Sequence, residues 1–140
     1  MDKYYTPDIS EFFVGFEFYI KDDKNIFTNH FVKEDIFCRT DLLKKYIKDN
    51  FYQVKYLDKE DIESLGFIVS SDYGASIEFK FQDRYKLVKV KHEGLTYSKN
   101  EIRIFENNSI FGEDYRERLF IGNIKNKSEL VKLLKQLGIG

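Results

Sequence analysis

The chain contains few of the residues that build small secreted proteins or that divide a sequence into domains. Its 140 residues include one cysteine, Cys38, and one proline, Pro7. A single cysteine excludes a disulfide within the chain and favours a reducing compartment. No segment rich in proline, glycine or serine interrupts the sequence, so we expect one domain over residues 1–140, with residues 1–9 flexible or loosely packed.

Long apolar runs are missing as well. No run approaches the ~20 residues that a helix needs to cross a bilayer. The opening MDKYYTPD lacks the basic and apolar regions of a signal peptide. We therefore expect a cytoplasmic protein with no membrane partner.

Neither sign of charge is in excess. The 23 basic and 24 acidic side chains give a formal net charge of −1. Domains that bind nucleic acid through their whole surface usually have a clear basic excess, so only a local basic strip stays open as a nucleic-acid site.

Motifs of the common enzyme classes are also absent. The sequence has no phosphate-binding loop, glycine-rich dinucleotide fingerprint, HExxH or nucleophile elbow. Cys38, His30 and His92 offer too few thiol and imidazole ligands for a typical zinc site. We expect no catalytic residues, no metal and no cofactor.

One pattern resembles a nuclease site. Asp72 followed by Glu78 and Lys80 has the spacing of an Asp…Glu-x-Lys set, in which carboxylates hold a divalent metal. Both Glu78 and Lys80 alternate with apolar residues, as on the solvent side of a half-buried strand. We therefore predict that these residues are exposed and not catalytic.

Aromatic residues are abundant, with 14 Phe and 10 Tyr among segments that alternate as strands do. Strands are predicted at 11–21, 26–33, 51–57, 66–71, 76–81, 85–91, 101–106 and 118–124. Helices are predicted at 41–50, at 58–66 between an Asp58 N-cap and a Gly66 C-cap, and after a Ser128 N-cap near the C-terminus. The expected fold is α+β: an antiparallel, aromatic-rich β-meander sheet with two or three short helices, including a C-terminal amphipathic helix.

Two surfaces are candidate binding sites. The segment 107–118 fits neither helix nor strand period, yet it places apolar residues among charges, as protein-binding patches do. Its candidate residues are Ile110, Phe111, Glu113, Asp114, Tyr115, Arg116 and Arg118. A basic strip interleaved with tyrosines is the candidate for a nucleic acid. Its residues are Tyr85, Lys86, Lys89, Lys91, His92, Tyr97 and Arg103.

Three segments resemble sequences that recur in small phage and prophage proteins of Bacteroidetes-type hosts: YTPDISEFFVGFEFY (5–19), LDKEDIESLGF (57–67) and FIGNIKNKSELVKLLKQLGI (120–139). The resemblance implies a mobile-element origin, the cytosol of a bacterial host and no assigned activity. Such proteins are most often binders, for example inhibitors of a host defence system of the anti-CRISPR kind. A nucleic-acid-binding accessory protein and a virion or assembly component are the alternatives.

Overall fold

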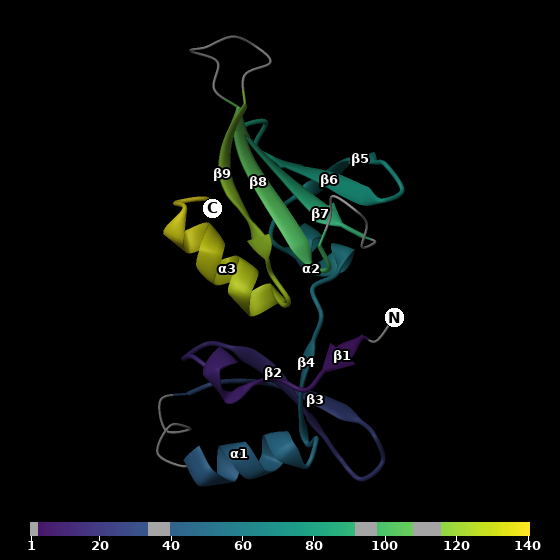
Figure 1. Ribbon diagram of the computed structural model, residues 1–140, viewed down its shortest axis with the longest axis vertical. Helices are drawn as coiled ribbons and strands as arrows, with labels where there is room; N and C mark the ends of the chain where they lie inside the picture. Colours follow the sequence, from purple (N-terminus) through teal and green to yellow (C-terminus); the bar gives the residue numbers. More distant parts are fainter. Residues whose placement is uncertain (1–2, 34–39, 92–97, 108–115) are drawn as a thin grey trace. The chain divides into compact units, whose positions relative to one another are not determined.

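The computed structural model describes residues 3–33, 40–91, 98–107 and 116–140. Its backbone divides into two compact units: unit 1 is Met1–Tyr56 with Asn126–Leu133, and unit 2 is Leu57–Lys125 with Leu134–Gly140. Each unit is built on an antiparallel sheet (Figure 1), so the predicted α+β class is confirmed, with two sheets in place of the expected one. A single domain over 1–140 stays a prediction.

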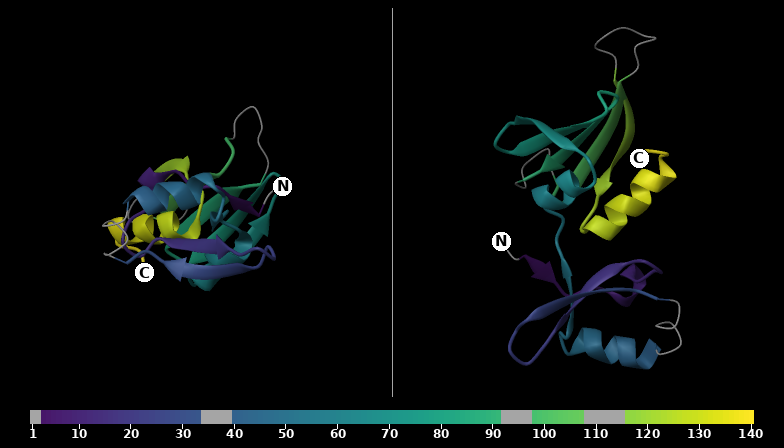
Figure 2. Two further views of the ribbon diagram at one scale, coloured as in Figure 1. Left: turned by 90° about the horizontal axis from the view of Figure 1, so that it is seen from below. Right: turned by 180° about the vertical axis from the view of Figure 1, so that it is seen from behind.

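Unit 1 contains what we call the N-terminal sheet, with strand order β1-β4-β2-β3 and antiparallel pairing throughout. Its strands are β1 (Tyr4–Tyr5), β2 (Glu17–Lys21), β3 (Phe27–Phe31) and β4 (Tyr52–Lys55). Helix α1 (Thr40–Lys48) lies along one side of this sheet (Figures 1 and 2). Leu43 of α1 joins the buried cluster of Phe12, Phe16, Phe18, Val32 and Val54. The phenylalanines of the opening segment therefore form the core of this unit, as their alternation indicated.

The predicted strand over 11–21 is wrong in its first half. A 3-10 helix, η1 (Ile9–Glu11), occupies its start, and β2 begins only at Glu17. Gly15 has a φ of +92°, which L residues rarely adopt, and its amide donates to the Val32 carbonyl at 2.9 Å. This bend leaves Val14 55% exposed. The alternation of apolar residues therefore extends over a turn as well as over the strand, and the positive φ of this turn is one that glycine adopts easily.

The N-terminal segment makes contacts within unit 1 from β1 onward. β1 pairs with β4, and Pro7 is buried. The Tyr5 hydroxyl donates to Glu11 Oε1 at 2.7 Å and accepts from Asn126 Nδ2 at 2.9 Å. Burial, followed by the bond to Glu11, raises the pKa of Tyr5, so this hydroxyl stays protonated and remains a donor.

Unit 2 contains the meander sheet, in which β5 to β9 pair in chain order. The strands are β5 (Ile68–Asp72), β6 (Ser76–Phe81), β7 (Tyr85–Val90), β8 (Glu101–Asn107) and β9 (Arg116–Asn123). All five predicted segments in this region form strands, with ends that differ by about two residues. Figures 1 and 2 show the same succession of strands from opposite sides. Both outer strands contain a register shift, between Val69 and Ser71 in β5 and opposite Ile104–Phe105 in β9.

One face of the meander sheet is apolar, and we call it the inner face. Phe79, Leu87, Ile102 and Ile104 are fully buried there, on neighbouring strands. Ile62 of helix α2 (Lys59–Ser64) is also fully buried within this unit. The alternation of each strand places its remaining side chains on the opposite face, the outer face.

The helix ends follow local capping rules with one correction. Asp58 and Asp61 form the capping box of α2, and Gly66 has a φ of +97° just after its end. Helix α3 (Lys127–Gln136) is capped by Asn126, whose Oδ1 accepts from the Glu129 amide at 2.9 Å. The predicted cap Ser128 instead accepts from the Glu17 amide at 2.8 Å. Within the described ranges, no helix is long and apolar enough to span a membrane.

Candidate functional site on the outer face of the meander sheet

The outer face is built from two rows of side chains that run across the strands. Directly opposed residues of an antiparallel pair point to the same side, so the pairing defines the rows. The first row is Ile68, Lys80, Lys86, Phe105 and Arg118, and the second is Ser71, Glu78, Val88, Arg103 and Ile121. Four basic side chains face one carboxylate in these rows, although the whole chain has a net charge of −1.

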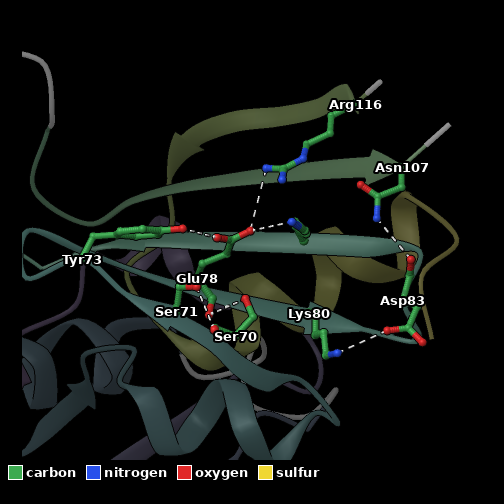
Figure 3. A network of polar contacts seen from close by, with 9 residues as sticks. Ser70, Ser71, Tyr73, Glu78, Lys80, Asp83, Asn107 and Arg116 are labelled. Carbon is green, nitrogen blue, oxygen red and sulfur yellow. Dashed lines mark hydrogen bonds and ion pairs between the residues drawn. The ribbon is translucent and has the colours of Figure 1, made fainter. Parts of the chain in front are cut away.

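Glu78 is the centre of a polar cluster on this face (Figure 3). Its Oε1 lies 3.1 Å from Lys86 Nζ and 3.8 Å from Arg116 Nη1, and its Oε2 accepts from the Tyr73 hydroxyl at 3.1 Å. We call Tyr73, Glu78, Lys86 and Arg116 the Glu78 cluster. Arg116 belongs to β9, so its side chain reaches over β8 and β7 to meet a residue of β6. The cluster therefore links β9 to β6 across the two strands between them.

The Glu78 side chain is buried although it lies on the outer face. Its residue is 6% exposed, whereas Tyr73 is 66% exposed. Burial by itself raises the pKa of Glu78, but Lys86, Tyr73 and Arg116 outweigh it and hold the pKa below its usual range. Within the described residues Oε1 has no aligned hydrogen bond, so ion pairs hold this atom. The carboxylate is therefore charged at neutral pH and fixed among cations.

The local sequence explains why Lys86 turns toward Glu78. In the β6–β7 hairpin Lys80 and Lys86 stand directly opposite each other, which is unfavourable for like charges. Each lysine has a carboxylate within reach: Lys86 pairs with Glu78 across the diagonal, and Lys80 pairs with Asp83 of the turn at 3.3 Å. The two ammonium groups are thus drawn apart along the hairpin.

The nuclease-like set does not assemble. Asp72 stands opposite Ile77, a residue of the inner face, and its carboxylate binds Lys91 Nζ at 2.7 Å. Glu78 points to the outer face, so the two carboxylates do not share a site. Among the described residues, no group of three or more His, Cys, Asp or Glu side chains could hold a metal. Lys80 is exposed as predicted, but the prediction that Glu78 is exposed is wrong, because Arg116 and Tyr73 cover it.

The nucleic-acid candidates are divided between the faces. Lys86 and Arg103 lie on the outer face, whereas Tyr85 and Lys89 share the inner face with Leu87. Burial lowers the pKa of Lys89, and the Asp58 carboxylate opposes this shift. Lys91 is bonded to Asp72, while His92 and Tyr97 lie outside the described residues. The three-residue spacing from Lys86 to Lys89 already indicated opposite faces, since side chains alternate along a strand.

The protein-binding candidates are described only at their end. Ile110, Phe111, Glu113, Asp114 and Tyr115 lie outside the described residues, as does Cys38. Arg116 and Arg118 belong to β9 and point to the outer face, where Lys86 and Arg103 of the other candidate list also lie. The described members of both lists therefore meet on one surface. The sequence analysis did not identify Tyr73 or the central role of Glu78. The contact between Glu78 and Lys86 could have been found, because the register of the β6–β7 hairpin makes these two residues diagonal neighbours.

His30, the remaining metal candidate, is in β3 of unit 1, where its ring stacks on Phe18 at 5.8 Å. No family model, curated protein or solved structure matches the chain. The chemistry of the outer face is therefore the basis for a functional conclusion.

Proposed function

We propose that this chain is a non-enzymatic accessory protein that acts by binding another protein through the outer face of its meander sheet. The observation that supports the proposal is the combination of exposed aliphatic and cationic side chains on one face of the sheet. Ile121 of β9 is 44% exposed opposite Arg103, and Ile68 of β5 is 63% exposed opposite Lys80. Arginine and tyrosine beside exposed apolar side chains are typical of protein-binding patches.

The non-enzymatic role is supported by the separation of the acidic groups. Asp72 and Glu78 point to opposite faces, and Glu78 is already paired with two cations. Incubation with single- and double-stranded DNA and RNA plus magnesium or manganese tests this part. We expect no cleavage. Cleavage that disappears in Glu78→Ala would contradict it.

The partner is proposed from the resemblance to phage and prophage proteins of Bacteroidetes-type hosts. Small mobile-element proteins that lack enzyme motifs commonly act by blocking a host protein. The partner that we propose is a host defence protein, such as a CRISPR effector. Expression of this chain in a host with active CRISPR interference should then restore plaque formation by a targeted phage. Arg118→Glu, on the exposed part of β9, should abolish the restoration.

Capture from host lysate, with and without nuclease, tests the binding surface. We expect nuclease-resistant capture that is lost in Ile121→Asp and in Arg118→Glu. Matched controls in unit 1 are Val14→Asp, which is 55% exposed, and Lys24→Glu, which is exposed in a turn. Melting temperatures of all four variants should stay near the wild type, since each changed side chain is exposed. Capture that nuclease removes, or that the two outer-face variants retain, argues against the proposal.

A further inference from the structure

The Glu78 cluster presents two exposed side chains of the kinds that dominate binding energy at protein interfaces. Tyr73 is 66% exposed and the side chain of Arg116 is 47% exposed, yet both are tied to one buried carboxylate. Tyrosine and arginine are enriched among the residues that contribute most to binding. In Figure 3 they approach Glu78 from opposite sides, one from the β5–β6 turn and one from β9.

The charge of the surface indicates what it binds. The outer face contains Lys80, Lys86, Arg103, Arg116 and Arg118 against the carboxylates of Glu78 and Glu101, with Asp83 of the turn beside Lys80, so cations are in excess. Opposed charge steers association and rejects partners of like charge. An acidic surface is therefore the complement of this face.

The apolar side chains favour a protein over a nucleic acid as the acidic partner. Single-stranded nucleic acids are held by exposed rings on which successive bases stack. Among the described outer-face residues Tyr73 is one exposed ring and Phe105 is only partly exposed, so successive rings for stacking are missing, and Ile68 and Ile121 are aliphatic.

We infer that the outer face recognises a protein segment in which carboxylates alternate with aliphatic side chains, and that Glu78 is a positioning residue for this recognition. This inference rests on the proposed protein-binding function. Glu78 fixes Arg116 and Tyr73 before the partner arrives, so less side-chain freedom is lost on binding. The guanidinium of Arg116 has five N–H donors, so a partner carboxylate can bind it while Glu78 keeps its place.

A designed peptide tests the inference without knowledge of the natural partner. The probe is a soluble peptide alternating glutamate and leucine, compared with a lysine–leucine peptide and with single-stranded oligothymidine. We expect the glutamate peptide to bind, with affinity that falls as salt is added. Its amide shift changes in NMR spectra should centre on Lys80, Arg118 and Ile121. Arg118→Glu should weaken binding by about tenfold or more.

A double-mutant cycle tests the positioning role of Glu78. Glu78→Gln should weaken peptide binding roughly fivefold in the wild-type chain and leave it unchanged in an Arg116→Ala, Tyr73→Phe background, in which Glu78 holds neither side chain. A purely structural role of Glu78 would weaken binding equally in both backgrounds and would overturn the positioning role.

Failure of the inference and failure of the proposed function give different results. If the glutamate peptide does not bind while outer-face variants still abolish nuclease-resistant capture, the protein-binding function stands and the acidic-partner inference is wrong. Preferred binding of the lysine peptide or of oligothymidine also overturns the inference. If capture is lost on nuclease treatment and oligothymidine binds, the proposed function fails as well.

Discussion

Removing the charge of Glu78 should destabilise the meander sheet by a measurable amount. Loss of one partner of a fully buried ion pair costs about 3–5 kcal/mol, because the other charge is left uncompensated. Here the side chain of Lys86 is 23% exposed and that of Arg116 is 47% exposed, so water can partly solvate both cations. We therefore expect Glu78→Gln to lower the free energy of unfolding by about 2 kcal/mol, close to the contribution of a charged hydrogen bond.

Thermal unfolding followed by far-ultraviolet circular dichroism measures this loss. A change of about 2 kcal/mol in a chain of this size corresponds to a decrease in Tm of roughly 6–10 °C. Asp83→Asn is the matched control on the same hairpin, because Asp83 pairs with Lys80 but its side chain is 86% exposed. Exposed pairs of this type contribute about 0–1 kcal/mol, so the control should melt close to the wild type.

The pH dependence separates loss of charge from loss of packing. The folded pKa of Glu78 lies below the ordinary value of 4.5. The stability that its charge provides is therefore fully present above pH 4.5 and is lost as the pH falls through the folded pKa. The difference between wild type and Glu78→Gln should be largest near neutral pH and shrink in acid. A difference that stays constant down to pH about 2–3 would refute the electrostatic reasoning.

Three further predictions concern other buried or constrained positions. Asn126→Ala removes a helix cap and the bond to the partly buried Tyr5, so urea denaturation should show a loss of about 2–3 kcal/mol, whereas Asn126→Asp should keep the cap. Burial lowers the pKa of Lys89, so its ammonium opposes folding at neutral pH; Lys89→Met should raise Tm at pH about 7, and this gain should shrink as alkali deprotonates the wild type. A lower Tm for Lys89→Met would contradict that sign. Gly66→Ala, with φ +97° and a ring carbon 3.1 Å from the new Cβ, should lose more stability in urea than Gly74→Ala, where φ is +82° and nothing lies within 4 Å.

The meander sheet was predictable because each strand has its own signal. Alternating apolar residues and short polar turns separate the segments, and neighbouring segments pair in chain order. The alternation of side chains along a strand also places Lys86 and Lys89 on different faces of the sheet. Helix α2 was predictable for a similar reason, since Asp58 and Gly66 are local start and stop signals.

Other features depend on contacts that the local sequence does not contain. Val14 continues the apolar alternation, but a hydrogen bond between Gly15 and Val32 turns the chain before the strand begins. Glu78 has the position of an exposed strand residue and is buried only because Arg116, 38 residues further along the chain, reaches over two strands to cover it. The turn at Gly15 and the burial of Glu78 both depend on contacts with residues distant in the sequence. The alternation of apolar and polar residues within a strand does not specify such contacts.

The register shifts in β5 and β9 also affect how the protein associates. A sheet ends in strands whose free amides and carbonyls can template another chain, and a bulge twists such a strand so that it pairs poorly. Both outermost strands of the meander contain one. Strand addition, the first step of fibre growth, is therefore disfavoured at either border, which leaves the outer face between them as the surface for a partner. Binding there leaves every ladder hydrogen bond intact. On binding, amides of the edge strands β5 and β9 should therefore gain no more protection from exchange than amides of the central strands.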